Sequence, residues 1–387
     1  MNPLFIFKAN QAPEKRLASQ RGVSLIETMV GMGLGILVSL IIVQVWGNFE
    51  SQKQRTVSGS SAQENGLLAL TELEVDVRGA GAGLTDSAAF DCTSLYSYYE
   101  TAGVAVTPIP AYSGGMGLVP IQIIDGGTGS DTLTTKRGSD FLGALPAVIT
   151  NTMPSSSSVL DVNSITGFAD GDVVLAVDSS TGKCTVMSIT QVMGSALKLQ
   201  HNPGGSTTYN PPTSFQNTNA WPAFSTGAKI LKIGNLLVRS YTVNGSNQLA
   251  QTATSGAGAA TTAVLAGDIV KLKAQYGIAN VGSQDVNAWV NATAATGWNV
   301  LDSAKVKRIK AVRLVIVARS SQREGADVTS TCTNISLNVN NGPCAWVDTA
   351  ADPAPLIDLS ANADWKKYRY RVYQSVIPMR NVIWAGV

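Results

Sequence analysis

The residues with the clearest chemical potential lie near the N-terminus, in the order Gly22, Val23 and Glu27. Hydrolysis of the peptide bond after Gly22 would leave a free ammonium group on Val23, close in sequence to the Glu27 carboxylate. Residues 28–49, directly after Glu27, carry no charge and could cross a bilayer as a helix. An unpaired carboxylate costs roughly 2.5–3.5 kcal/mol at mid-bilayer and less near an end. We therefore expect Glu27 to have a partner, and the Val23 ammonium of this chain or of a neighbour is the natural one.

The segment before this run is basic. It contains one acidic residue, Glu14, and four basic residues, Lys8, Lys15, Arg16 and Arg21. Such a bias holds this end of the chain in the cytoplasm, so the part after the apolar run is expected on the other side of the membrane. Removing residues 1–22 changes the formal net charge from +2 to −1. Bulk attraction of the mature chain to nucleic acid is therefore not predicted.

Together these features resemble the type IV prepilin signal, which combines a basic leader, a glycine at the cleavage site, a glutamate soon after it and an apolar helix. The resemblance implies cleavage between Gly22 and Val23 by prepilin peptidase, N-methylation of Val23 and an assembly role for Glu27. Val23 departs from the phenylalanine that the family most often places after the cut. An ordinary signal anchor is the alternative, and it leaves the cost of Glu27 unexplained.

Small residues recur every four positions within the apolar run, at Gly31, Gly35 and Ser39. Such a stripe lets helix backbones approach closely, which predicts a helix-packing face. Chance in a glycine-rich helix is the alternative.

Beyond residue 49 the helix is expected to continue as an amphipathic segment. Leu67, Leu70, Leu73 and Val77 follow spacings of three and four, with Asp76 and several glutamates around them. The glycines of residues 79–83 should end the helix. The predicted organisation is a leader (1–22), a long helix (23–80, transmembrane over 23–49 and amphipathic over 50–80) and a β-rich outer domain (81–387).

After residue 83 the sequence reads as short strands separated by turn residues. Strands are expected at residues 119–124, 131–136, 172–178, 183–192, 196–200, 229–233, 236–243, 267–276, 306–319 and 366–377. Residues 153–158, 202–222 and 252–263 are expected to be loops, and the second of these is long enough to be mobile or a contact surface.

The cysteines all lie in the outer part: Cys92, Cys184, Cys332 and Cys344. An even number in an oxidising compartment favours disulfides. Cys332 with Cys344 is the first choice because it closes a short, turn-rich loop, and Cys92 with Cys184 follows by elimination. A zinc site is the alternative, but the chain has no Cys-x-x-Cys pair and only one histidine, His201.

Later segments are similar to PilW-type minor pilins. Residues 74–81 (Glu-Val-Asp-Val-Arg-Gly-Ala-Gly) look like the helix end of that family, and its later landmarks match residues 130–134, 275–278, 312–320, 370–373 and 377–381. Residues 141–221 carry no landmark of this kind. Some members have an Asp-rich, potentially calcium-binding loop after the Tyr-Gly landmark, but residues 279–284 lack such ligands here, so no metal is expected.

Catalysis is not expected. His201 is predicted to be an ordinary surface histidine whose hydrogen bonds are satisfied, and the sequence contains no P-loop or cofactor motif. Two basic groups could in principle bind single-stranded nucleic acid: Lys305, Lys307, Arg308, Lys310 and Arg313, and Lys367, Arg369 and Arg371. Period-two alternation instead predicts that their charges are solvated while neighbouring tyrosines and aliphatic residues enter the core.

The sequence thus predicts an α+β, type IV pilin-like fold and a non-enzymatic minor pilin without cofactors. The resemblance implies partners among other minor pilins, the major pilin, prepilin peptidase and a tip adhesin, in a tip or priming complex that supports twitching motility, adhesion or DNA uptake. It also implies residence in the bacterial inner membrane, with the C-terminal domain in the periplasm, and then on the pilus or cell surface. A J-type pseudopilin of type II secretion is the nearest alternative, and a pilus-associated DNA receptor is one of another class.

Overall fold

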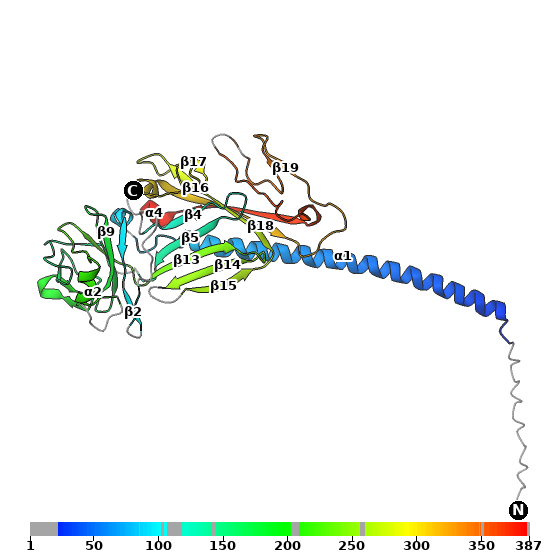
Figure 1. Ribbon diagram of the computed structural model, residues 1–387, viewed down its shortest axis with the longest axis horizontal. Coiled ribbons are helices and arrows are strands. Elements are labelled where there is room, and N and C mark those ends of the chain that lie inside the picture. The colour runs from blue at the N-terminus through cyan, green and yellow to red at the C-terminus, as the bar shows by residue number, and fades with distance from the viewer. Residues whose placement is uncertain are drawn as a thin grey trace, which may run out of the picture. The chain divides into compact units, whose positions relative to one another are not determined.

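The computed structural model in Figure 1 describes residues 22–84, 86–101, 104–106, 118–140, 144–202, 209–255, 260–347, 349 and 352–384. These residues divide after Thr56 into two units, and each unit is considered by itself. Residues 1–21 of the expected leader lie outside the described residues.

Helix α1 (Leu25–Gly79) has 55 residues and belongs to both units. Hydroxyl groups within it donate to carbonyl oxygens one turn earlier, as Thr28 does to Leu25 and Ser39 to Gly35, each at 2.8 Å. These hydroxyls are therefore satisfied without a partner outside the helix, which suits an apolar environment. The helix ends at Gly79, and Gly81 then takes a φ of +78°, a conformation that residues with a side chain rarely adopt.

The C-terminal unit is built mainly from short strands. The first are β1 (Ser94–Tyr96), β2 (Tyr99–Thr101), β3 (Val104–Val106), β4 (Ile121–Ile124), β5 (Thr132–Gly138), β6 (Ala147–Val148), β7 (Leu160–Asp161), β8 (Val173–Asp178), β9 (Lys183–Ser188), β10 (Gln191–Met193) and β11 (Lys198–Gln200). The later ones are β12 (Lys229–Lys232), β13 (Leu236–Val243), β14 (Leu249–Ser255), β15 (Thr261–Ala266), β16 (Ile269–Ala279), β17 (Val286–Val290), β18 (Ile309–Arg319), β19 (Cys332–Thr333), β20 (Val339–Asn340) and β21 (Tyr370–Pro378). Short helices are η1 (Ser87–Asp91), η2 (Gly194–Ala196), α2 (Thr213–Thr218), α3 (Ser303–Arg308), η3 (Trp365–Lys367) and α4 (Arg380–Trp384).

Three sheets hold most of these strands. The β13 sheet has the order β15-β14-β13-β5-β4, and the β18 sheet has the order β17-β16-β18-β21 (Figure 1). The β8 sheet has the order β1-β9-β8-β12-β6 and includes a parallel pairing between β1 and β9. Smaller sheets join β10-β11-β7, β2-β3 and β19-β20. The long helix and the β-rich remainder agree with the predicted α+β class.

A strand occurs within every range where the sequence predicts one, with three clear differences in extent. The strand expected at residues 366–377 begins only at Tyr370, and Lys366 and Lys367 belong to η3 instead. Residues 183–192 are divided between β9 and β10. Residues 306–308 belong to α3 rather than to the following strand, because the Asp302 side chain accepts a hydrogen bond from the Lys305 N–H (2.8 Å) and caps a short helix there.

The expected loop at residues 252–263 is wrong. Strands β14 and β15 occupy its described parts, and Thr252 pairs with Thr262 across them, their hydroxyl oxygens 3.0 Å apart. Threonine and alanine alternate in this segment and are both weakly hydrophobic, so the segment lacks the strong period-two hydrophobic pattern that predicts a strand. The β-branched threonines nevertheless suit a pleated, half-exposed strand.

The main core lies between the second half of α1 and the β13 and β18 sheets. Strand β18 is buried on both faces: Val312, Leu314 and Ile316 enter this core, while Val315 and Val317 join a separate cluster with Trp365. Burial on both faces explains why β18 reads as a continuous apolar run rather than an alternating one.

The β8 sheet likewise separates two cores. Leu175, Val177 and Leu231 face the main core, whereas Val174, Ala176 and Ile230 face a second cluster. The expected loop at 202–222 packs beside this sheet instead of forming a bare connection: it contains α2, whose Phe215 ring lies 4.8 Å from Tyr98 and 6.0 Å from Trp221 between centroids. Residues 203–208 of that loop lie outside the described residues.

Both disulfides have the pairing that the sequence favours. Cys92, which follows η1, is bonded to Cys184 of β9, and Cys332 of β19 is bonded to Cys344. The Cα atoms are 5.6 and 5.7 Å apart, within the usual range for a disulfide.

Candidate functional site: the N-terminal segment and the docked half of helix α1

The N-terminal segment turns into helix at Ser24. Its carbonyl oxygen accepts hydrogen bonds from the N–H groups of Glu27 (2.9 Å) and Thr28 (3.1 Å), and its hydroxyl accepts one from Ile26 (3.3 Å). Ser24 therefore acts as a helix cap. Glu27 lies in the first turn of α1, where a negative charge interacts favourably with the helix dipole.

The first half of α1 exposes apolar side chains on every face as far as Phe49, and residues 50–56 that follow are polar. Leu25, Ile26, Ile36 and Ile41 are between 59% and 79% exposed. The segment is long and apolar enough to cross a membrane, by length and composition. A helix that is hydrophobic all round belongs in an apolar environment, a bilayer or a bundle of similar helices.

The expected packing face has no neighbour within the described chain. A side-chain Cβ placed at Gly31 or Gly35 would have nothing within 4 Å, so intramolecular packing does not require glycine there. Ser39 satisfies its hydroxyl internally. The small residues are thus available to another molecule.

The second half of α1 is different. It buries one stripe composed of Ala62, Ala69, Leu70, Leu73 and Val77, and Ala80 just after the helix joins the same core. Leu67, expected on this stripe, is instead 56% exposed. The buried face runs through Ala62, Gly66, Ala69 and Leu70, so Gly66 faces the core and Leu67 faces outward.

Gly66 is required by a close approach of strand β21. A Cβ at this position would overlap the Tyr373 ring, whose hydroxyl donates a hydrogen bond to the Gln63 carbonyl oxygen (3.0 Å). The ring therefore lies across the helix backbone where a side chain would otherwise stand. Gly66, unlike Gly31 and Gly35, is therefore explained by a contact within the chain.

Asp76 anchors the same half of the helix to the β13 sheet. It is 2% exposed, and its carboxylate accepts hydrogen bonds from the Arg239 guanidinium (2.6 Å) and the Tyr241 hydroxyl. Arg137 adds a third interaction at 3.7 Å. Burial, followed by the bond to Asp76, raises the pKa of Tyr241. Both basic partners come from strands, so the carboxylate ties α1 to β5 and β13.

This role of Asp76 is not evident from periodicity, which groups it with the acidic residues on the polar face. The signal that could have revealed it is its place in the family-like residues 74–81. Its neighbour Glu74 is bound by Ser375 of β21 and by Arg78 (2.7 Å). Two acidic residues on one turn thus contact two different sheets.

The end of α1 is held by backbone contacts. The Gly81 N–H donates to the Lys136 carbonyl oxygen (2.8 Å), and the Gly138 N–H donates to that of Ala82 (2.7 Å). The Asn381 side chain donates to the Ala80 carbonyl oxygen (3.0 Å). Residues 74–81 and 377–381, far apart in sequence, therefore meet at this point.

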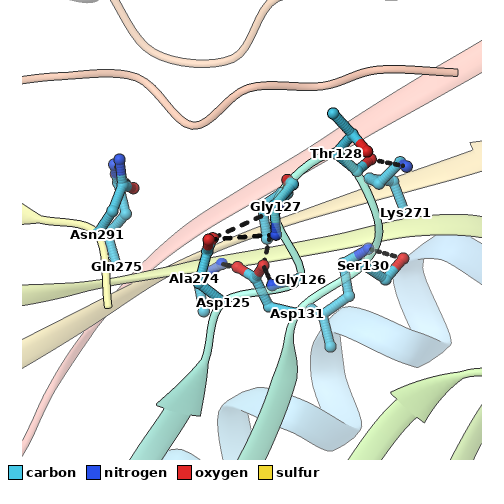
Figure 2. A network of polar contacts seen from close by, with 12 residues as sticks. Asp125, Gly126, Gly127, Thr128, Ser130, Asp131, Lys271, Ala274, Gln275 and Asn291 are labelled. Atoms are coloured by element: carbon cyan, nitrogen blue, oxygen red, sulfur yellow. Dashed lines mark hydrogen bonds and ion pairs between the residues drawn. The ribbon is translucent and has the colours of Figure 1, made fainter. Parts of the chain in front are cut away.

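The turn between β4 and β5 hydrogen-bonds to the edge of strand β16 where β17 does not pair with it (Figure 2). The Asp131 N–H donates to the Leu272 carbonyl oxygen (2.8 Å), and the Asp131 carboxylate accepts from the Ala274 N–H (2.9 Å) and from Lys273 Nζ (2.7 Å). Burial raises the pKa of Asp131 above its ordinary value, and Lys273 opposes this shift only in part. The family-like residues 130–134 thus join the β13 and β18 sheets and cover a strand edge.

Most of the first basic group is engaged within the protein. Arg313 is 2% exposed and lies between the rings of Trp289 and Trp346, 4.7 and 4.9 Å from their centroids. Lys307 pairs with Asp91 (2.9 Å), and Lys310 is 2% exposed. The expectation that these charges are solvated is therefore wrong for Lys310 and Arg313, because β18 is buried on both faces.

The second basic group lies at the surface with acidic partners. Lys367 pairs with Asp364 (2.9 Å) and Arg369 with Glu324 (3.0 Å), while Arg371 is exposed. Hydrogen bonds from Arg323 and then from Lys367 lower the pKa of Asp364 to about 2. This arrangement leaves little unneutralised charge for a nucleic-acid backbone.

His201 is buried, contrary to the surface position expected for it. It is 6% exposed, and its Nε2 donates to the Ser158 carbonyl oxygen (2.7 Å). Burial lowers the pKa of the His201 imidazole. Among the described residues no group of three or more His, Cys, Asp or Glu side chains could hold a metal ion.

Comparison with known proteins gives one family match. Residues 237–381, from β13 to α4, match the family model of the type IV pilus-assembly protein W, PilW. No curated protein and no solved structure matches the chain significantly. The matched part contains Arg239, Tyr241, Tyr373 and Asn381, which hold the second half of α1. The family implies a role in type IV pilus assembly, and the match confirms the resemblance of this chain to PilW-type pilus proteins.

Proposed function

We propose that this chain is a minor pilin that enters a tip or priming complex of the type IV pilus. The observation that carries the proposal is the pairing of a PilW-matching region with a helix segment whose apolar side chains are exposed on every face. Such a segment needs a bilayer before assembly and neighbouring pilin helices afterwards. The partners are other minor pilins, the major pilin and, at the tip, an adhesin.

Processing by prepilin peptidase is part of this proposal. Cleavage after Gly22 leaves Val23 as the new N-terminus, which is then N-methylated. Gly22 and Val23 precede the helix in the structure and are exposed, so the peptide bond between them lies outside the α1 hydrogen-bonding ladder. Gly22→Arg should leave the precursor uncut, and N-terminal sequencing of membrane-extracted protein should begin at Val23.

Glu27 then serves assembly rather than insertion. The new ammonium group of Val23, on this chain or on a neighbour, neutralises its carboxylate in the packed filament. Truncating one partner of a charge pair in a low dielectric costs several kcal/mol, because the other charge is left uncompensated. Gly31, Gly35 and Ser39 would line the close helix contacts that bring such charges together.

The test is Glu27→Val in the full chain. The variant should insert and be cleaved, since the apolar run only becomes more hydrophobic. It should co-purify poorly with partner pilins from detergent extracts, and the number of sheared surface pili should fall. Gly47→Ala, on the same helix and also without a neighbour within 4 Å, is the control for a change that adds apolar volume. Normal partner recovery and normal piliation with Glu27→Val would refute the assembly role.

Contribution to twitching, adhesion or DNA uptake follows from pilus formation. A direct DNA-receptor role is disfavoured by the acidic partners of Lys367 and Arg369. Replacing Lys367, Arg369 and Arg371 by Gln should leave piliation and DNA uptake near normal. A selective loss of DNA uptake with normal pili would reverse this ranking.

A further inference from the structure

A polar cavity lies where strands β16, β18 and β21 come together at one end of the β18 sheet. Its volume is about 340 Å³, and its walls include Lys271, Arg319, Asp358, Asn247, Asn362 and Tyr370. Arg319 is the last residue of β18 and is paired in register with Tyr370, the first residue of β21. This cavity, the β18–β21 pocket, belongs to no feature described above.

Arg319 is held in place by its surroundings, but its Nε finds no hydrogen-bond acceptor in the part of the chain that the structure describes. Its carbon Cζ lies 4.4 Å from the centroid of the Tyr368 ring, and its backbone N–H donates to the Asp268 carbonyl oxygen (2.8 Å). The Nε atom is itself buried. A guanidinium stacked on an aromatic ring keeps its planar set of donors for a carboxylate or phosphate.

Lys271 adds a second positive charge to the pocket. It is 7% exposed, and its ammonium donates one hydrogen bond, to the Thr128 carbonyl oxygen (2.7 Å; Figure 2). An ammonium has three donors, so this bond uses only part of its capacity. Burial, followed by the nearby Lys273 ammonium, lowers the pKa of Lys271, while Asp358 and Asp131 oppose the shift.

Asp358 is the acidic residue in the pocket wall, and its carboxylate is already engaged. It accepts the Ser360 N–H (2.9 Å), and hydrogen bonds from Ser360 lower the pKa of Asp358, with further help from Asn341 and Lys271. The carboxylate is thus ionised at neutral pH. The pocket wall thus carries two positive charges, on Arg319 and Lys271, and one negative charge, on Asp358. One positive charge is left over, so a ligand with a single negative charge would make the site neutral, whereas a doubly charged one would give it a net negative charge.

We propose that the β18–β21 pocket binds a carboxylate group, with Arg319 as the planar donor and Lys271 as the second cation. Asn247, Asn362 and the Tyr370 ring would surround the rest of the ligand. The carboxylate comes either from a small free acid or from an acidic residue of a neighbouring pilus subunit. Only the second source rests on the proposed function.

Acetate is the probe for the full chain in detergent. Unfolding midpoints should rise saturably with sodium acetate relative to sodium chloride at equal ionic strength, because a ligand that binds the native state stabilises it by mass action. Arg319→Gln should weaken the apparent affinity for acetate roughly tenfold or more, because it removes a charge-assisted hydrogen bond. Arg371→Gln, an exposed arginine on the adjacent strand, is the matched control and should behave as wild type.

Absence of a saturable acetate effect in the wild type, or its persistence in Arg319→Gln, would overturn the proposal. If Arg319→Gln does not fold, Arg319→Lys and Lys271→Gln take its place, and each should weaken acetate binding if the pocket is correct. Partner subunits purified with the chain distinguish the sources. Their release by saturating acetate, but not by chloride, identifies a subunit carboxylate, and their retention identifies a free acid. The acetate titration of the unfolding midpoint tests the pocket even if no pilus partner co-purifies with the chain.

Discussion

Both halves of helix α1 contain acidic residues and glycines, but an acidic residue and a glycine that are exposed in the first half have buried counterparts in the second. Glu27 in the first half is exposed, whereas Asp76 in the second is buried among Arg239, Tyr241 and Arg137. Gly35 has nothing near it, whereas the Cβ position of Gly66 is filled by the Tyr373 ring. The second half is therefore a component of the folded domain, whereas the glycines of the first half have no contact within the described chain that explains them.

The largest effect should come from the buried carboxylate. Asp76→Asn leaves Arg239 partly buried without its counter-charge and should lower the free energy of unfolding by about 3–5 kcal/mol. Chemical denaturation of the full chain in mild detergent, followed by tryptophan fluorescence, measures this. Asp125→Asn is the comparison, because Asp125 lies 3.6 Å from Lys273 and is more exposed, and its loss should matter much less. Equal effects of the two variants would contradict the central role of Asp76.

Gly66→Ala should give the next largest effect. Its methyl group would collide with Tyr373 and is expected to cost about 1–3 kcal/mol, as overpacking of a core does. Gly35→Ala, with open space around it, should leave domain stability unchanged and strengthen the helix locally by up to ~1 kcal/mol. Combining Gly66→Ala with Tyr373→Leu should recover part of the loss. No recovery in this double-mutant cycle would show that the ring is not the cause.

A smaller effect concerns pH and Lys136, whose carbonyl oxygen holds the end of α1. Burial lowers the pKa of the Lys136 ammonium from 10.5 to about 8. Between these values the unfolded chain binds more protons than the folded one, so this group makes stability rise with pH across that window. Wild type and Lys136→Met should therefore differ in the slope of unfolding free energy against pH between 8 and 10. Identical slopes would contradict the burial of this charge.

The smallest effect on stability should come from Glu27. Because its side chain is exposed in the first half of α1, Glu27→Val should change the unfolding free energy of the domain by less than ~0.5 kcal/mol, even though it impairs assembly. The same denaturation assay measures it. Marked destabilisation would show that the two halves are coupled more tightly than their contacts indicate.

The elements that depend on local pattern are predictable from the amino-acid sequence. The uncharged run at 28–49 predicts an apolar helix long enough to cross a bilayer, and the glycines near residue 79 predict the end of that helix. The most regular strands are equally local, since alternation or a continuous apolar run is visible without knowing the partner strand. The PilW resemblance rests on residues near both ends of the chain, and the family match at residues 237–381 covers the C-terminal ones.

Which polar residues are structural depends on tertiary contacts that the sequence does not reveal. By sequence alone, Asp76 looks like a surface acid of a helix and Asp131 like the first residue of a strand. Their burial depends on arginine and lysine side chains supplied by distant strands. Leu67 follows the helical spacing yet points outward, because Tyr373 of β21 approaches over Gly66. Arg319 and Lys271 acquire a common cavity only when β16, β18 and β21 are aligned. Such roles depend on contacts across many residues of chain, and no local pattern of residues encodes them.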